Sequence, residues 1–207
     1  MGQFISFEGA EAAGKSTQLR LLAARLEAAG SEVICTREPG GTSLGERLRE
    51  LILPGADTTN DPTAELLLLN AARAQLVAEV IRPALQRGAI VLVDRFADAT
   101  LAYQGYGRGG DLVELRTVIR IATHGLQPHR TVLLDVPSDV SAERLDRRGA
   151  QNFFDRMGAD FLARVRDGYL ELARQDPERW HVISGIGSPE EVALQIWDAL
   201  APLFVRV

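Results

Sequence analysis

The segment FEGAEAAGKST, residues 7–17, constrains this chain more than any other part of its sequence. Gly9, four further residues and then Gly14, Lys15 and Ser16 match the phosphate-binding loop pattern G-x-x-x-x-G-K-[ST]. In this pattern, backbone N–H groups surround an anion, the lysine reaches the outer phosphates, and the hydroxyl takes a position on Mg²⁺. The sequence therefore predicts a site for a phosphorylated ligand near its start.

Short apolar runs alternate with amphipathic segments along the whole chain. Strands are predicted at 4–7, 32–36, 90–94, 131–135 and 181–183. Helices are predicted at 17–29, 42–51, 61–87, 112–123, 138–148, 159–175 and 188–204. Pro83 is expected to bend or break the third helix near its end. This alternation predicts an α/β fold in which a five-stranded parallel sheet has helices on both faces.

Composition limits both the size of the fold and its partners. With 207 residues, the chain is long enough for one compact domain, predicted to span residues 1–207. Lys and Arg number 23 and Asp and Glu 28, so the net charge of −5 argues against binding of nucleic-acid polymers. With no apolar run of about 18 residues, no membrane association is expected, and a cytoplasmic location is predicted. The single cysteine, Cys35, excludes an internal disulfide and is expected in a buried strand.

Three charged residues stand where a ligand site would need them. Arg37 begins a turn-rich loop after the second strand, where a phosphate contact and an ordinary exposed arginine are both open. Asp94 ends the third strand, the position from which an acid holds Mg²⁺ directly or through water in such proteins. Arg73 lies one helical turn after Leu69, so its charge needs a partner, which a ligand could supply.

Two further segments bear on assembly and function. Residues 66–69 are four consecutive leucines, so their helix is apolar around much of its girth. Burial against a partner subunit and burial wholly within one domain are both open for it. The helix at 138–148 ends in an arginine cluster (Arg144, Arg147 and Arg148) beside an irregular segment, so a lid is expected at about 147–158. A simple solvated face is the alternative for this cluster.

Four motifs in the correct order resemble those of the bacterial thymidylate kinases. They are FEG with the phosphate loop, TREPGGT at 36–42, the segment from DRF at 94–96 to AYQG at 102–105, and YLEL at 169–172. The resemblance covers almost all of the chain, and general phosphate-loop kinases do not carry both the second and the third motif. It implies the nucleoside monophosphate kinase type of the P-loop NTPase fold. It also implies a Mg²⁺-dependent transfer of the γ-phosphoryl group of ATP to dTMP, giving dTDP for dTTP biosynthesis, by a protein that is usually a homodimer.

The resemblance also assigns residues to the two substrates. It implies ATP binding by Gly9, Ala10, Glu11, Ala12, Ala13, Gly14, Lys15, Ser16 and Thr17. It implies dTMP binding by Glu11, Arg37, Pro39, Leu69, Arg73, Arg95, Thr100, Tyr103 and Gln104. It implies that Mg²⁺ is held by Ser16 and Asp94.

Within the dTMP set, the resemblance implies distinct roles. Arg37 and Arg95 would clamp the acceptor phosphate, and Glu11 would approach the sugar 3′-hydroxyl. Arg73 would bond the pyrimidine edge, while Tyr103 would sit beneath the deoxyribose and exclude a 2′-hydroxyl. The base and phosphate would also be contacted by Pro39, Thr100 and Gln104.

Phosphoryl transfer in this family needs a further positive charge at the transition state. One group of members carries a basic residue inside the phosphate loop, and the other supplies arginines from the lid. Ala12 and Ala13 place this chain in the second group, so the lid candidates are Arg147, Arg148 and Arg156. The predicted catalytic set is Lys15, Arg37, Arg95, Arg147, Arg148 and Glu11.

The sequence departs from the family pattern at three positions. Leu69 replaces the aromatic residue that usually stacks on thymine, and Phe153 replaces the second arginine of the usual lid sequence. Ala12 replaces a loop glycine, and alanine tolerates positive φ less well than glycine does. Two alternatives therefore stay open: a kinase of the same fold with another base preference, and a nucleotide-binding module without transfer activity.

Overall fold

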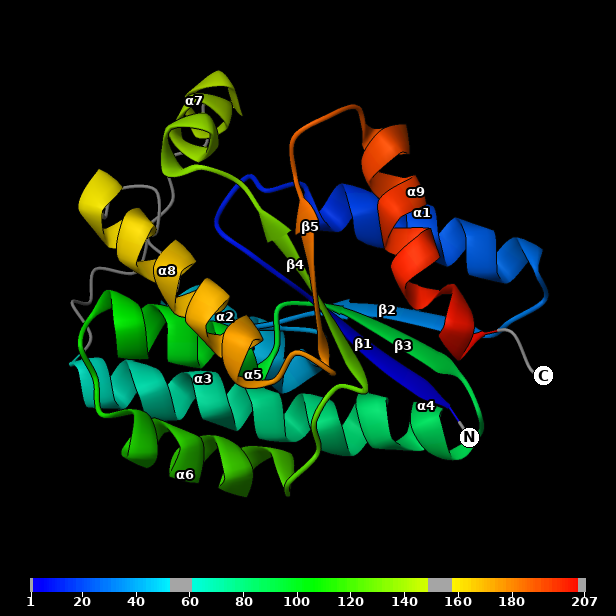
Figure 1. Cartoon of the computed structure of the whole chain (residues 1–207). Coiled ribbons are helices and arrows are strands. Elements are labelled where there is room, and N and C mark those ends of the chain that lie inside the picture. The colour runs from blue at the N-terminus through cyan, green and yellow to red at the C-terminus, as the bar shows by residue number, and fades with distance from the viewer. Residues whose placement is uncertain (1, 53–60, 149–157, 205–207) are drawn as a thin grey trace.

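The computed structural model describes residues 2–52, 61–148 and 158–204. Five parallel strands form one sheet in the order β2-β3-β1-β4-β5, and helices cover both of its faces (Figure 1). The strands are β1 (Gln3–Glu8), β2 (Val33–Arg37), β3 (Ile90–Asp94), β4 (Arg130–Asp135) and β5 (Trp180–Ser184). The predicted α/β fold with a five-stranded parallel sheet is confirmed.

Side chains of the central strands alternate between the two faces of the sheet. On β1, Ile5 and Phe7 point to the face covered by α1 (Lys15–Ala28) and α9 (Pro189–Leu200). Phe4 points to the opposite face and meets Phe96 edge-to-face, with the ring centroids 5.0 Å apart. Burial on both faces explains why these strands read as nearly continuous apolar runs.

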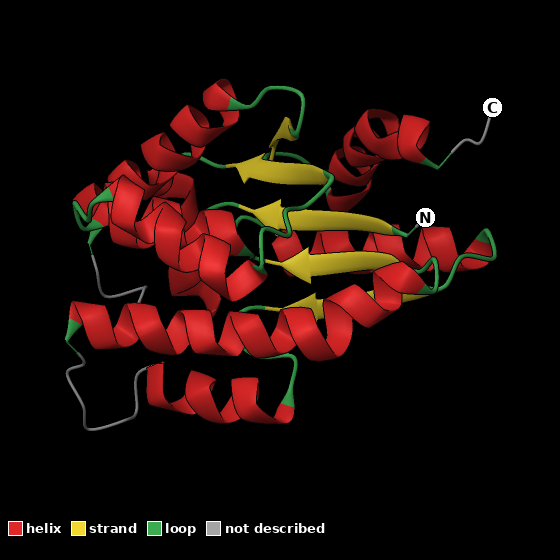
Figure 2. Cartoon of the chain, turned by 90° about the horizontal axis from the view of Figure 1, so that it is seen from below, coloured by secondary structure: helices red, strands yellow, loops and turns green. Residues whose placement is uncertain are grey.

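Six of the remaining helices are α2 (Ser43–Ile52), α3 (Pro62–Leu76), α4 (Arg82–Gln86), α5 (Ala97–Thr100), α6 (Leu112–Thr123) and α8 (Ala159–Gln175). Helices lie in front of the sheet and beyond the arrow ends of its strands when it is seen from below (Figure 2). The last helix, α7 (Ser138–Arg148), lies beyond the end of β4, and its Val140 packs against the core that contains Ile5 and Phe7. A short 3₁₀ turn, Ala201–Leu203, follows α9. Over the described ranges, none of the helices combines the length and the apolar character needed to cross a membrane.

Helix starts follow the local signals in the sequence. The Asp61 carboxylate accepts the N–H groups of Thr63 and Ala64, ahead of a proline at the first helical position of α3. Ser188 and Glu191 form a reciprocal capping box at the start of α9. Both starts agree with the prediction.

The helix predicted at 61–87 is confirmed, because helical structure runs from Pro62 to Gln86 through α3, a π-helical turn (Val77–Ile81) and α4. The chain does not leave the helix at Pro83, since the π-helical turn changes the hydrogen-bonding pattern where the proline ring would meet a backbone carbonyl. One expectation is corrected. Cys35 is exposed rather than buried, because β2 is an edge strand. A second π-helical turn, Leu101–Gly107, extends α5 through a segment for which the sequence predicted no regular structure.

The register of the sheet brings three distant motifs together. Asp94, at the end of β3, pairs with Phe7 in β1 and with Arg37 in β2. The phosphate loop, the loop after Arg37 and the turn at Arg95 therefore leave the sheet at the same carboxyl edge. Open parallel sheets bind their ligands at this edge.

Candidate active site

The phosphate loop joins β1 to α1 and needs backbone conformations that few residues adopt. Gly9 has φ 136°, and a Cβ there would lie 2.6 Å from the carbonyl oxygen of Leu134. Gly14 has φ 101°. Ala12 also has a positive φ, 54°, which costs an L-residue about 1–2 kcal/mol. The loop is therefore strained at Ala12, where the resemblance implies a glycine.

Lys15 is the only lysine of the sequence, and its side chain is buried inside this loop. Its Nζ donates to the carbonyl oxygens of Gly9 at 3.0 Å and Ala10 at 2.7 Å. Burial and the nearby charge of Arg95 lower the pKa of Lys15 to about 8. A phosphate in the loop would lie beside this group and favour its charged form.

Ser16 and Asp94, predicted as Mg²⁺ ligands, lie side by side. Ser16 Oγ donates to Asp94 Oδ2 at 2.6 Å. One carboxylate and one hydroxyl beside a phosphate site fit Mg²⁺, which keeps several waters and takes its other oxygens from substrate phosphates. In the described part of the chain, no cluster of three or more His, Cys, Asp or Glu side chains offers a metal site made of protein alone.

Arg95 begins the turn after β3 with φ 66° and faces the loop. Its guanidinium lies 2.8 Å from Glu11 Oε1 and donates to the Tyr103 hydroxyl at 2.8 Å. Burial disfavours the charge on Arg95, but the Glu11 carboxylate holds its pKa well above the usual value. Burial likewise opposes ionisation of Glu11, but the charges of Arg95 and Lys15 keep its pKa below the usual value. Both members of the pair are therefore charged.

Glu8, the last residue of β1, holds the Arg95 turn in place. Its carboxyl group accepts the Phe96 N–H at 2.7 Å and the Tyr169 hydroxyl at 3.0 Å. Burial, together with the charge of Asp98, raises the pKa of Glu8 to about 8. Glu8 thus connects β1, the Arg95 turn and α8.

Three cavities open around the phosphate loop. The first, here the loop cavity, has a volume of about 220 Å³ and is lined by residues 11–17 together with Arg37, Arg49, Asp94 and Arg95. The second, the Leu69 cavity, has a volume of about 40 Å³ and shares Glu38 and Arg95 with the loop cavity. The third, the Arg144 cavity, has a volume of about 150 Å³ and shares Ala12, Ala13, Gly14 and Thr17 with it. The loop cavity therefore borders both of the others.

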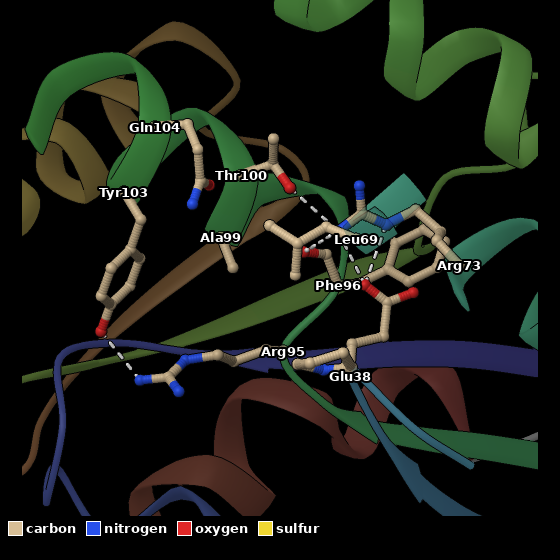
Figure 3. A pocket seen from close by; sticks show the side chains of 10 residues that line it. Glu38, Leu69, Arg73, Arg95, Phe96, Ala99, Thr100, Tyr103 and Gln104 are labelled. Carbon is tan, nitrogen blue, oxygen red and sulfur yellow. Dashed lines mark hydrogen bonds and ion pairs between the residues drawn. The ribbon is translucent and has the colours of Figure 1, made fainter. Parts of the chain in front are cut away.

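The Leu69 cavity brings together most residues that the resemblance assigns to dTMP (Figure 3). Its lining includes Pro39, Leu69, Arg73, Arg95, Thr100, Tyr103 and Gln104. The other two residues of that set, Glu11 and Arg37, line the loop cavity. The predicted set is therefore spread over two adjoining cavities, with Arg95 in both.

Arg73 is buried in the wall of the Leu69 cavity and already has a partner (Figure 3). Its guanidinium forms an ion pair with Glu38 at 2.8 Å and donates to Thr100 Oγ1 at 3.0 Å and to Asn70 Oδ1 at 2.8 Å. The partner that this charge was predicted to need is therefore Glu38. The same contacts fix the orientation of the guanidinium.

Thr100, Tyr103 and Gln104 project from one helical segment into this region (Figure 3). The guanidinium carbon of Arg95 lies 5.1 Å from the centroid of the Tyr103 ring. Gln104 Nε2 donates to Glu65 Oε1 at 3.0 Å. The segment therefore supplies one preorganised wall of the Leu69 cavity.

The loop cavity concentrates positive charge. Arg37 is half exposed and pairs with Glu46 at 2.8 Å, while Arg49 of α2 donates to the Pro39 carbonyl at 2.7 Å. Burial and the charge of Arg37 lower the pKa of Arg49. With Arg95, these side chains give the cavity the character of an anion site.

On the far side of the loop, α7 is attached by two side chains. Arg144 donates to the Gly185 carbonyl at 3.0 Å and to the Ala12 carbonyl at 3.4 Å. Ser141 Oγ donates to the Glu11 carbonyl at 2.5 Å. Arg144 thereby forms a wall of the cavity named after it.

The predicted lid at about 147–158 falls largely outside the described residues. Arg156 and the side chain of Arg148 lie outside them as well. Arg147 is exposed and pairs with Glu143 on its own helix. A role for these arginines at the loop stays a prediction.

Sequence reasoning gave no role to three residues that shape the site (Glu8, Glu38 and Arg49), and it considered a fourth, Arg144, only as a member of the arginine cluster beside the predicted lid. Glu8 and Glu38 stand inside the motifs FEG and TREPGGT, so their positions carried a signal. Arg49 and Arg144 stand on helices, and only folding shows that they reach the loop.

Comparisons with known proteins agree on one family. The thymidylate kinase family model matches residues 7–196. The chain is 47% identical to the thymidylate kinase of Roseiflexus sp. (strain RS-1), over 100% of this chain and 97% of that protein. It is 48% identical to the thymidylate kinase of Deinococcus radiodurans, over 97% of each. Among solved structures, the thymidylate kinase of Ehrlichia chaffeensis matches with a TM-score of 0.80 and 33% identity, over 96% of this chain and 98% of that one.

Proposed function

Because this chain belongs to the thymidylate kinase family, we propose that it transfers the γ-phosphoryl group of ATP to dTMP, producing ADP and dTDP. One observation carries the proposal. Arg95 lines both the loop cavity and the Leu69 cavity, so a nucleotide in the Leu69 cavity would present its phosphate to the phosphate loop. Such transfer requires positioning and charge neutralisation rather than covalent chemistry by the protein.

On the donor side, Lys15 and the loop amides bind the β- and γ-phosphates of ATP. The adenosine half occupies the Arg144 cavity, which adjoins the loop on the side away from Arg95. There the Arg144 guanidinium, fixed by the Gly185 carbonyl at 3.0 Å, offers a flat cation against which a purine can stack.

Ser16 and Asp94 would hold Mg²⁺, which would neutralise negative charge on the phosphates of ATP. Their 2.6 Å contact supports this assignment because it places both oxygens at one point beside the loop. These are the two metal-binding residues of this proposal.

On the acceptor side, Arg37, Arg49 and Arg95 bind the phosphate of dTMP. Glu11 positions the sugar and holds Arg95 through their 2.8 Å ion pair. Tyr103 packs against the deoxyribose and leaves no room for a 2′-hydroxyl. This arrangement turns the acceptor phosphate toward the γ-phosphate, as in-line transfer needs.

The pyrimidine occupies the Leu69 cavity. Arg73 donates to its edge, and the ion pair with Glu38 at 2.8 Å keeps the guanidinium oriented for this bond. Pro39 and Leu69 cover the faces of the ring, while Thr100 and Gln104 border it. Aliphatic cover in place of an aromatic ring predicts weaker stacking.

The phosphate loop has no cation between Gly9 and Gly14, so further transition-state charge comes from elsewhere. We assign it to Arg147 or Arg148 from the predicted lid at about 147–158. An arginine that enters at the transition state contributes roughly 10³ or more in rate. In this proposal, residues 1–207 form one kinase domain.

We also propose that the chain is a homodimer. Large apolar side chains are exposed on α2 (Leu44 and Leu51), on α3 (Leu67) and on α6 (Val113 and Ile121). Since α3 packs against both α2 and α6, a second copy could cover this surface. A cytoplasmic location fits substrates whose phosphates prevent unaided passage through a membrane.

Coupled ADP release with dTMP, dUMP, dCMP, UMP and AMP tests the function. We expect the fastest turnover with dTMP. Fastest turnover with dCMP, UMP or AMP would overturn the assignment. ATP binding without any transfer would instead support a nucleotide-binding module.

A further inference from the structure

A fourth cavity lies apart from the phosphate loop. Its volume of about 340 Å³ exceeds those of the other three, about 220, 150 and 40 Å³. Its walls come from α5, from one side of α6 and from the loop at 125–128 that leads to β4. We call it the Arg116 cavity. We propose that it binds one nucleoside polyphosphate, such as dTTP or ATP, in addition to the two nucleotides that react at the phosphate loop.

The inner surface of the Arg116 cavity suits a flat ring. Ala97, Leu101, Ile119 and Leu126 line it with apolar side chains. Ligand cavities of about 300–1,000 Å³ typically combine such a surface with a few polar groups that fix orientation. The cavity is large enough for a base and its sugar, with room at the rim for phosphates.

The rim of the cavity carries uncompensated positive charge. Arg179 is balanced by Asp98 at 2.6 Å and by Asp176 at 2.8 Å. Arg116 donates only to the neutral amide of Gln175, at 3.2 Å, and neither it nor Arg120 has a carboxylate partner among the residues that the structure describes. Two guanidiniums on one side of α6 are suited to bidentate contacts with phosphates.

The Arg116 cavity and the Leu69 cavity share one helical segment as a common wall. Ala97, Asp98 and Leu101 line the former, while Ala99, Thr100 and Tyr103 line the latter. All six belong to the continuous helical segment at 97–107. A ligand in the Arg116 cavity that displaces this segment changes the fit of dTMP in the Leu69 cavity, and dTMP must in turn change the affinity of the Arg116 cavity for its ligand. This coupling, unlike nucleotide binding in the Arg116 cavity, rests on the function proposed above.

Titration calorimetry on the full chain tests the binding. The chain is first saturated with a bisubstrate in which five phosphates join adenosine to thymidine, and dTTP or ATP is then added. We expect one further nucleotide to bind per chain. Tripolyphosphate, which lacks the ring, and thymidine, which lacks the charge, should each bind about tenfold more weakly or worse.

Variants locate the site. Both arginines are exposed, so Arg116→Ala and Arg120→Ala should fold, and each should weaken binding of the added nucleotide about tenfold. Arg47 is an exposed arginine on α2, and Arg47→Ala should leave the affinity for the added nucleotide unchanged. In the parent chain, but not in Arg116→Ala, the added nucleotide should change the KM for dTMP.

Two results would overturn the site: no added binding of dTTP or ATP at millimolar concentration, or equal binding by the parent and both variants. Binding with an unchanged KM for dTMP would overturn the coupling. If the bisubstrate itself fails to bind, the proposed function is in doubt. The comparison of the parent with Arg116→Ala and Arg120→Ala still decides the second site in that case, because it does not depend on catalysis.

Discussion

The guanidinium of Arg95 and the carboxylate of Glu11 lie 2.8 Å apart, with side-chain exposures of only 18% and 17%. Glu11 belongs to the phosphate loop and Arg95 to the turn after β3, so this pair connects the donor site to the acceptor site. Breaking a partly buried pair by removing one member leaves the other charge uncompensated. The pair therefore couples the position of the acceptor phosphate to the shape of the loop.

Replacement of Arg95 by lysine tests this connection. Arg95→Lys keeps the charge but cannot contact Glu11, Tyr103 and a phosphate together, because lysine lacks the planar fork of donors. We expect kcat/KM for dTMP to fall about 10²-fold, mostly through kcat, with little change in melting temperature. Initial rates with varied dTMP measure this. Arg47→Lys on α2 is the matched control, and a loss in Arg95→Lys no larger than in that control would contradict the assigned role.

Lys15 should be required in its charged form. Lys15→Ala should lower kcat by about 10²–10³, by comparison with removal of one preorganised donor. The pKa of Lys15 in the protein without nucleotide is about 8. We therefore expect kcat/KM for ATP to fall as pH rises above that value, because the neutral amine cannot balance phosphate charge.

The titration of Lys15 can be observed directly. It is the only lysine in the sequence, so reductive methylation with ¹³C-formaldehyde gives one side-chain NMR signal besides that of the terminal amine. We expect this signal to titrate near pH 8 and to shift to higher pH when ATP is added. A pKa that stays near 10.5, the usual lysine value, would show that the side chain is not desolvated as described.

Ala12 should be a site where glycine stabilises the protein. At φ 54°, alanine is strained and glycine is not, so Ala12→Gly should relieve strain in the folded state. Glycine also raises the entropy of the unfolded chain, which opposes this gain, and the net increase in the free energy of unfolding should be about 1 kcal/mol. For a chain of this size, the melting temperature should rise by about 2–4 °C. The neighbouring Ala13, which is buried and has no positive φ, provides the control: Ala13→Gly should lower the melting temperature. Equal effects in the two variants would contradict the strain at Ala12.

Glu8 should make stability depend on pH. Its pKa rises from 4.5 to about 8 on folding, so the folded state keeps a proton that the unfolded state releases. The free energy of unfolding should therefore fall as pH rises from about 4.5 to about 8, by a few kcal/mol at most, and then level off. Urea unfolding between pH 5 and 9 measures this slope. Glu8→Gln should flatten it, whereas Glu178→Gln, at an exposed position, should not.

Much of the fold could be predicted because its signals are local. The strands at 90–94 and 131–135 are apolar runs of the length that a buried parallel strand needs, and Asp61 and Ser188 begin helices through bonds to residues within three positions. The edge position of β2 depends on the strand order, so the exposure of Cys35 could not be predicted from its own segment.

The site divides in the same way. Ser16 and Asp94 belong to motifs that were each recognisable, and their contact follows from the parallel register of β1 and β3. Glu38 was not expected to balance Arg73, because the two residues lie 35 positions apart and no periodicity links them. Long-range pairing of buried charges is set by packing, so it was the part of the site that sequence reasoning missed.

Leu69 offers a final test of how the chain holds its base. The side chain lines the cavity proposed for the pyrimidine, at the position where the resemblance implies an aromatic ring. Leu69→Phe should add ring stacking, which contributes about 0.5–1.5 kcal/mol beyond area burial, and so lower the KM for dTMP by roughly two- to tenfold. Leu67→Phe, on the exposed side of the same helix, should leave the KM unchanged. Kinetics of both variants with dTMP and dUMP measure the effect. A raised KM in Leu69→Phe would mean that the cavity is already filled by the base and the neighbouring Phe96, and that the aliphatic residue is required by its shape.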